Sequence, residues 1–359
     1  MSKRPSASHE PLTMSRMLAE AYEAPSVVEC QLASNHERVK ELAERIRRIK
    51  PHFIATCARG SSNNAAVYAR YLIETRLGLP VTASAPSVGG LYQGPMDLRR
   101  SILLCISQSG ASDDLVHHAK WAKNSGAWVV SLLNTPNSPL GEVSDFILPL
   151  HAGQEASVAA TKSYLASLSA LLQLTAHLAE DDGELLPLLD ELPQQLEQAK
   201  ALDWSSPVET LASRQELYVV GRGLGLSVAL EAGLKFKEAC RLHAEAFSGA
   251  ELLHGPVALI DPGFPVLLFA QGDATLDSQR QVARKLQQAG ATMITAGLNS
   301  KSPRLGETTM DLPVVADVHP VVAPLLLSQS CYGLVELVAQ ARGFDPDQPP
   351  HLRKITHTR

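Results

Sequence analysis

The sequence predicts an α/β protein made of two similar halves, each a mostly parallel sheet flanked by helices in a flavodoxin-like three-layer sandwich. Three observations predict this fold class. The chain has 359 residues, which is enough for two domains. Short apolar runs alternate with helical stretches of about a dozen residues, as in parallel sheets that are covered on both faces. The order of these segments then occurs a second time.

The elements of the first half follow from hydrophobic periodicity and from the glycines that punctuate it. Runs that are apolar throughout predict buried strands, and runs with apolar residues three or four apart predict helices. In chain order we expect helices at 14–33 and 35–49, a strand at 52–57, a helix at 63–78, a strand at 101–107, a helix at 113–126, strands at 126–134 and 146–150, and helices within 157–200.

The second half repeats the same arrangement. Gly60 and Gly223 lie 163 positions apart, and Pro149 and Pro313 lie 164 apart, so one inserted residue accounts for the drift. Such self-similarity indicates a duplicated α/β unit. Its expected elements are strands at 216–221, 264–270, 290–297 and 311–315, a helix over ALEAGLKFKEACRLHAE at 229–245, and a long helix at 324–343.

This pattern divides the chain into four segments. We expect a flexible leader and N-terminal helices at 1–50, a first domain with linking helices at 51–200, a second domain at 201–342, and an irregular, proline-rich tail at 343–359.

Composition excludes several classes of function. The net charge is −5, which argues against a broad basic surface for nucleic acid. The sequence shows no apolar stretch of about 18 residues and no signal peptide at its start, so we expect neither a membrane span nor secretion. Five scattered cysteines without a C-x-x-C pair are typical of reduced thiols in a cytoplasmic protein.

Two serine-rich loops are candidate phosphate sites. The residues Gly60-Ser61-Ser62 follow the first expected strand, and Ser107-Gln108-Ser109-Gly110-Ala111-Ser112 separates the next strand from its helix. Hydroxyls and free backbone N–H groups at a helix N-terminus bind phosphate. The alternative is a serine N-cap with a turn glycine. The matching loop of the second half, Ala270–Asp273, has no serine, so we expect one half to hold phosphate.

One helix face and one loop carry titratable side chains. Glu231, Lys235 and Glu238 share a helix face, either as a solvated ion pair or as a partly buried group in which a carboxylate moves a proton. His254 precedes a glycine-proline turn and is either a surface residue or a ligand-facing one. With His243 and Glu251 it could form a zinc site, but no H-E-x-x-H motif or Cys pair supports this. We therefore expect no metal.

Together these stretches resemble the tandem sugar-isomerase (SIS) family, in the arrangement of the isomerase part of glucosamine-6-phosphate synthase. The resemblance covers nearly the whole chain after residue 50. It is carried by ARGSSNNAA, SQSGASDD, AGQEASVAATKSY, ALEAGLKFKEACRLHAEAFSGAELLHGPVALI and DQPPHLRK.

The resemblance assigns roles position by position. Glu238 matches the base that moves a proton between C1 and C2, with Lys235 and Glu231 beside it. His254 matches a ring-opening histidine that the partner subunit donates in this family, and Lys354 matches a lysine that reaches the open-chain sugar. Positions that match contacts to phosphate or sugar are Ser62, Ser107, Gln108, Ser109, Ser112 and Val158. We add Ser61 to these candidate phosphate-binding residues because it lies in the serine loop Gly60-Ser61-Ser62.

Departures from the synthase point to a narrower group. Only about fifty residues precede the first repeat here, so we expect no ammonia-generating domain, and Ala160 stands where the synthase has serine. The form SVAATK is more similar to standalone type II glucosamine-6-phosphate deaminases.

We therefore expect isomerising deamination of glucosamine 6-phosphate to fructose 6-phosphate and ammonia, by a cytoplasmic homodimer without a metal or redox cofactor. The alternatives are a plain aldose–ketose isomerase, a fructosamine-phosphate deglycase and a non-catalytic sugar-phosphate sensor.

Overall fold

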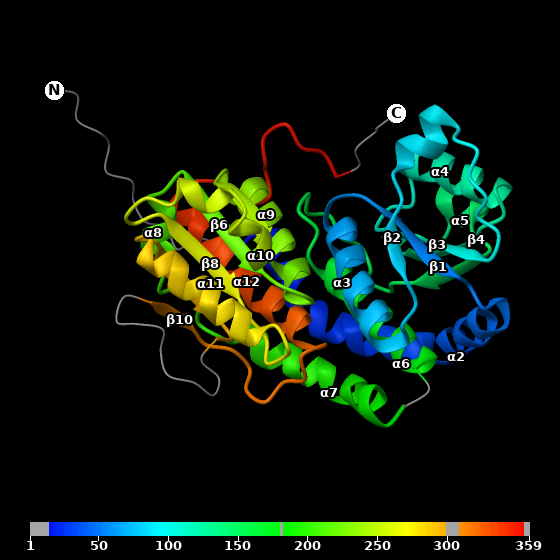
Figure 1. The fold of residues 1–359 in the computed structure, drawn as a ribbon, viewed down its shortest axis with the longest axis horizontal. Helices are drawn as coiled ribbons and strands as arrows, with labels where there is room; N and C mark the ends of the chain where they lie inside the picture. The colour runs from blue at the N-terminus through cyan, green and yellow to red at the C-terminus, as the bar shows by residue number, and fades with distance from the viewer. Residues whose placement is uncertain (1–13, 180–181, 299–308, 355–359) are drawn as a thin grey trace.

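A computed structural model describes residues 14–179, 182–298 and 309–354, and Figure 1 shows its two α/β halves. The leader that we expected at the start of the segment 1–50 lies outside the described residues. The N-terminal helices and first half comprise α1 (Arg16–Tyr22), α2 (Ala24–Ile49), β1 (Phe53–Ala58), α3 (Gly60–Leu77), β2 (Val81–Ala83), a π-helical turn (Val88–Tyr92), β3 (Ser101–Ser107), α4 (Asp113–Asn124), β4 (Trp128–Leu133), α5 (Pro139–Val143), β5 (Phe146–Pro149), α6 (Lys162–Leu178) and α7 (Asp182–Lys200).

The second half repeats this order with its own helices and strands. It comprises α8 (Val208–Ala212), β6 (Glu216–Gly221), α9 (Gly225–Cys240), β7 (His243–Ser248), α10 (Gly249–Leu252), a 3-10 turn (Pro256–Leu259), β8 (Pro265–Phe269), α11 (Leu276–Gln288), β9 (Thr292–Ala296), β10 (Met310–Leu312) and α12 (Ala323–Ala341).

Each half contains one five-stranded sheet, and every pairing among the described strands is parallel. The strand orders are β2-β1-β3-β4-β5 and β10-β9-β8-β6-β7, so the two sheets have the same topology. Apolar side chains are buried on both faces of each sheet; all seven residues of β3 are buried, for example. The predicted α/β fold of two tandem parallel sheets is confirmed.

Two predictions about the elements were wrong. We expected helices at 14–33 and 35–49, but the break falls at Glu23 and α2 is continuous from Ala24 to Ile49. We also expected a single helix over 229–245, but α9 ends at Cys240 and residues 243–248 form the edge strand β7. Arg241 has a left-handed φ of 50°, which ends the helix and turns the chain back along β6. The helical spacing of charged residues extends to the end of α9 and gave no signal for this reversal.

Helices α3 and α9 pack against each other where the two halves meet, in the middle of the view in Figure 1. Each follows the first strand of its own half. Their contact places one face of α9 against the loop that follows β1. Among the described helices, none is both long and apolar enough to cross a membrane.

Candidate active site

A pocket of about 210 Å³ lies at the carboxyl ends of β1 and β3, where open parallel sheets bind their ligands. Four separate segments form it: the loop after β1, the loop after β3, the segment before α6, and the tail after α12. Glu238 of α9 also lines it. The lining residues are Arg59, Gly60, Ser61, Ser62, Ile106, Ser107, Gln108, Ser109, Ser112, Leu115, Val158, Ala160, Glu238, Leu352, Arg353 and Lys354.

The structure therefore brings together most of the predicted site residues. Lys235 and Glu231 lie directly behind Glu238 on α9 rather than in the wall of the pocket. His254 is exposed in the turn after α10 and is not among the residues that line this pocket in its own chain.

The loop after β3 presents hydroxyl and N–H groups at the start of α4. Gly110 has a φ of 63°, and its N–H donates to Ser107 Oγ at 3.0 Å, which shapes the turn. Ser112 occupies the N-cap position, but its side chain makes no capping hydrogen bond. The purely structural alternative, a serine that caps α4, is therefore not what the structure shows. Its hydroxyl remains available to a ligand beside the helix N-terminus.

Two arginines add positive charge that sequence reasoning missed. Arg59 lines the pocket and pairs with Asp114 of α4 through Nε and Nη2, at 2.9 and 2.7 Å from Oδ2. Arg353 lines the pocket from the tail. Each stands next to a residue that we had selected, in ARGSS and in LRK, so proximity in sequence was the available signal. Asp114 compensates the charge of Arg59, whereas Arg353 is a cation beside the serine loops and favours an anionic ligand.

On α9, a buried lysine joins two carboxylates. Lys235 Nζ lies 2.6 Å from Glu238 Oε2 and 3.5 Å from Glu231 Oε1, and its side chain is 1% exposed. The Glu238 side chain is 18% exposed because it faces the pocket. The alternative of a solvated ion pair was therefore wrong, since only the pocket end of this row contacts solvent.

Glu231 links α9 to α3 across the two halves. Ser61 Oγ donates to Glu231 Oε1 at 3.0 Å, and Asn64 Nδ2 donates to Oε2 at 2.9 Å. Burial raises the pKa of Glu231, and the opposing effects of Lys235 and these donors are smaller. Burial disfavours the charged form of Lys235, but the charges of Glu231 and Glu238 outweigh it and raise the pKa of Lys235. The lysine therefore stays protonated beside Glu238.

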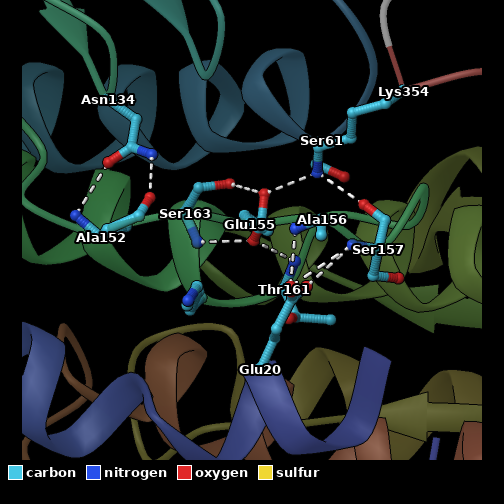
Figure 2. Close-up of polar contacts among 12 residues, drawn as sticks. Glu20, Ser61, Asn134, Ala152, Glu155, Ala156, Ser157, Thr161, Ser163 and Lys354 are labelled. Carbon is cyan, nitrogen blue, oxygen red and sulfur yellow. Dashed lines mark hydrogen bonds and ion pairs between the residues drawn. The ribbon is translucent and has the colours of Figure 1, made fainter. Parts of the chain in front are cut away.

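The segment between β5 and α6 is held by the buried carboxylates of Glu155 and Glu20, as Figure 2 shows. Glu155 accepts hydrogen bonds from the backbone N–H groups of Thr161 and Ser163, at 3.0 and 3.1 Å. Lys354 Nζ reaches the same carboxylate at 3.0 Å and also donates to the carbonyl of Ser157 at 2.6 Å. These contacts fix the tail lysine at the pocket.

The corresponding loop of the second half, 270–273, lines a separate cavity of about 530 Å³, and its polar side chains are hydrogen-bonded within the loop and to Arg222. Gln271 Nε2 donates to the Arg222 carbonyl and to Asp273 Oδ2, both at 3.0 Å, and Asp273 Oδ1 accepts from the N–H of Thr275 at 2.8 Å. The groups that would face a ligand in the first half here bind one another.

In the described ranges, no cluster of three or more His, Cys, Asp or Glu side chains has the geometry of a metal site.

Comparison with known proteins gives consistent results. A family model described as the SIS domain matches residues 49–177 and again 210–339. The glutamine–fructose-6-phosphate aminotransferase (isomerizing) of Thermococcus kodakarensis is 31% identical over 351 residues, which cover 94% of this chain and 57% of that protein. This chain thus spans just over half the length of that curated relative.

Two solved structures are also similar. A protein of Silicibacter pomeroyi, described provisionally as a phosphosugar isomerase, is 41% identical with a TM-score of 0.86; the match covers 93% of this chain and all of that one. The C-terminal domain of glucosamine-fructose-6-phosphate aminotransferase from Francisella tularensis is 27% identical with a TM-score of 0.84, over 96% of this chain and all of that one.

Proposed function

This chain belongs to the SIS domain family, and from that premise we propose that it acts on phosphorylated amino sugars. The specific reaction that we propose is isomerising deamination, in which glucosamine 6-phosphate and water give fructose 6-phosphate and ammonia. Both the aminotransferases and the phosphosugar isomerase among its relatives are named for work on sugar phosphates. The reaction itself is argued from the residues of the pocket.

The observation that carries the proposal is the placement of Glu238. This carboxylate is paired with a buried lysine and lines the same small pocket as the two serine loops. A phosphate held at the loops would place a six-carbon sugar across the pocket toward Glu238. A phosphate-binding site alone has no need of a carboxylate that faces the sugar, whereas a proton transfer between two carbons needs a base at that position.

Phosphate binding is assigned to Ser62, Ser107, Ser109 and Ser112, with Gln108, Ser61 and Arg59 beside them. The N-termini of α3 and α4 both point their free N–H groups to this region. Fixing the phosphate lowers the entropic cost of aligning the distal carbons with the base. Val158 would contact the sugar from the segment before α6.

The chemical steps follow from the remaining groups. His254, donated by a partner subunit, would help to open the pyranose ring. Glu238 would then take the proton from C2 of the open-chain aldehyde while O1 takes up a proton from the ammonium group of the substrate, which gives an enolamine. Lys354 would stabilise the charge that develops on O1, and the buried Lys235 would hold Glu238 in place. Return of that proton to C1 forms the imine of fructose 6-phosphate. Water adds to the imine carbon, and ammonia leaves.

A product assay tests this function. Purified protein is given glucosamine 6-phosphate without glutamine, and ammonia and fructose 6-phosphate are both quantified. Equal release of the two products is expected. Interconversion of glucose 6-phosphate and fructose 6-phosphate, with no ammonia from the amino sugar, would instead indicate a plain isomerase. Release of an amine from a fructosamine phosphate would indicate a deglycase, and saturable binding without any turnover a sensor.

A further inference from the structure

We propose that Glu155 is a positioning residue of this site, which orients Lys354 and the pocket segment before α6 as one unit. The inference rests on the proposed function, because it assigns Lys354 a task at the open-chain sugar. Glu155 does not line the pocket. It lies behind the wall, and its effect on a substrate would pass through the residues that it holds.

Glu155 is built into the fold as an acceptor. Its side chain is fully buried, and it accepts from two backbone N–H groups and from Ser163 Oγ, the last at 2.7 Å. The backbone donors lie at the start of α6, so the carboxylate also complements the positive end of that helix. A buried carboxylate with this set of donors has one stable orientation.

In that orientation, Glu155 Oε2 also accepts a hydrogen bond from the tail lysine, Lys354. Lys354 Nζ lies 3.0 Å from Glu155 Oε2, and the Lys354 side chain is 24% exposed toward the pocket. The second acceptor of the same ammonium is the carbonyl of Ser157, which adjoins Val158. The tail lysine and the sugar-facing segment are therefore attached to each other at Glu155 (Figure 2).

The electrostatics favour a charged pair here. Burial opposes ionisation of Glu155, but the charge of Lys354 and the hydrogen bonds from Ser163 and Thr161 outweigh it and lower the pKa of Glu155. A carboxamide at this position would be nearly the same size, yet it would lose the charge and turn an N–H group toward existing donors. The lysine would then lose its anchor while the pocket itself stayed intact.

A separate carboxylate holds the same segment from the other side. Glu20 of α1 accepts from the N–H groups of Ala156 and Ser157, at 2.6 and 3.1 Å, and has no contact with Lys354 among those that the structure gives for it. The segment thus has two supports, and the support from Glu155 is the one that also holds the tail.

The test compares Glu155→Gln with two reference variants. Ser163→Ala removes one donor to Glu155 but keeps its charge and its pair with Lys354, so its turnover should stay within about threefold of wild type. Glu155→Gln should lower kcat by about 10- to 100-fold with little change in KM, because the phosphate loops are unaffected. Glu155→Asp should recover part of the loss.

A double variant separates positioning from a general structural role. If Glu155 acts through the tail lysine, adding Glu155→Gln to Lys354→Met should cost little more than Lys354→Met alone. A full additional loss, or a Glu155→Gln enzyme as active as Ser163→Ala, would overturn the proposal. Circular dichroism and denaturant unfolding confirm that each variant is folded.

A second readout is independent of catalysis. Trypsin cleaves after Arg353 and Lys354, and intact-mass spectrometry follows that cleavage in the otherwise folded chain. Loss of the anchor in Glu155→Gln should speed cleavage by about tenfold, whereas Ser163→Ala should match wild type. If the wild type releases no ammonia, the proposed function fails, and this comparison still decides the role of Glu155: equal cleavage rates in all three proteins would contradict it.

Discussion

At the residue scale, the row Glu231–Lys235–Glu238 shows how burial changes the meaning of a common pattern. The spacing of these residues is that of an ordinary exposed ion pair. In the structure Lys235 is sealed between two carboxylates, and only Glu238 reaches the pocket. The ammonium keeps Glu238 oriented without competing for the face that a substrate would meet. This arrangement leaves one side of the Glu238 carboxylate open to the pocket, as the proposed proton transfer requires.

The lowered pKa of Glu155 gives a prediction about stability and pH. Its pKa in the folded state lies below the ordinary value of 4.5, so the pairing stabilises the fold fully above that value and is lost as pH falls through the folded-state pKa. The difference in unfolding free energy between wild type and Glu155→Gln should therefore be constant from about pH 7 to pH 5.5 and shrink below about pH 4.5.

Urea unfolding of both proteins over this range measures the difference directly. Other acidic groups titrate in the same way in both proteins, so their contributions to the unfolding free energy cancel in the difference. A difference that stays constant down to pH 4 would show that Glu155 does not gain this stabilisation from its charge.

The sequence predicted the residues of the α9 face but not their partners. Ser61 and Asn64 lie 170 and 167 positions from Glu231, and Glu155 lies 199 positions from Lys354. Local spacing carries information about neighbours on one helix. Contacts between distant segments depend on how whole elements pack, so Glu155 offered no signal beyond its place in AGQEASVAATKSY.

At the element scale, the strand-loop-helix units of both halves were predictable because each carries its own periodicity and glycine turn. The edge strand β7 was not. Its sequence, HAEAFS, has small and charged residues and is only partly buried, so it lacks the apolar signature of the central strands. The reversal at Arg241 uses a left-handed non-glycine residue, which sequence patterns rarely identify.

The loop after β3 depends on glycine at one position. Gly110 has a φ of 63°, and a Cβ there would lie 2.8 Å from Ser138 Cβ. We expect Gly110→Ala to destabilise the protein by about 3 kcal/mol through strain and overlap. It should also weaken binding of fructose 6-phosphate, because the serines on both sides of Gly110 would move.

Gly153→Ala is the matched control for this prediction. Gly153 has a similar φ of 66°, but a Cβ there would meet no atom within 4 Å. Its cost should be about 1 kcal/mol, from backbone strain alone. Thermal unfolding and sugar-phosphate titration of both variants check the account; equal effects of the two substitutions would contradict it.

At the scale of the whole molecule, the duplication does not give two equivalent sites. The first half supplies the serine loops, the second half supplies Glu238 through α9, and the tail supplies Lys354. In the second half, the corresponding loop has no serine, and Gln271 donates to Arg222 and, within the loop, to Asp273. The repeat could be predicted from sequence, and the unequal loops suggested one phosphate site. The meeting of both halves and the tail at one site follows from the family resemblance alone, because local sequence patterns do not show the packing of α3 against α9 that produces it.

His254 supplies a prediction about assembly. It is exposed and does not line the pocket of its own chain, and we infer that a second copy of this chain donates it. Two inactive variants, His254→Ala and Glu238→Gln, should then restore activity when co-expressed, because one site of each mixed dimer is intact. About a quarter of the wild-type rate is expected from random pairing in a symmetric dimer.

Co-expression of Glu238→Gln with Lys354→Met is the control. Both residues lie in the same pocket of one chain, so every site in a mixed dimer would carry a defect and no activity should return. Restoration in this pair, or failure in the first pair, would contradict donation across a subunit interface.

The central claim is that Glu238 moves the proton in an isomerising deamination. The most direct measurement compares wild type and Glu238→Gln for ammonia release from glucosamine 6-phosphate, with sugar-phosphate affinity measured by titration on the same samples. We predict rapid release by wild type, with fructose 6-phosphate in equal amount. Glu238→Gln should bind the sugar phosphate with similar affinity but release ammonia at least about a thousandfold more slowly. Near-normal release by Glu238→Gln would contradict the account.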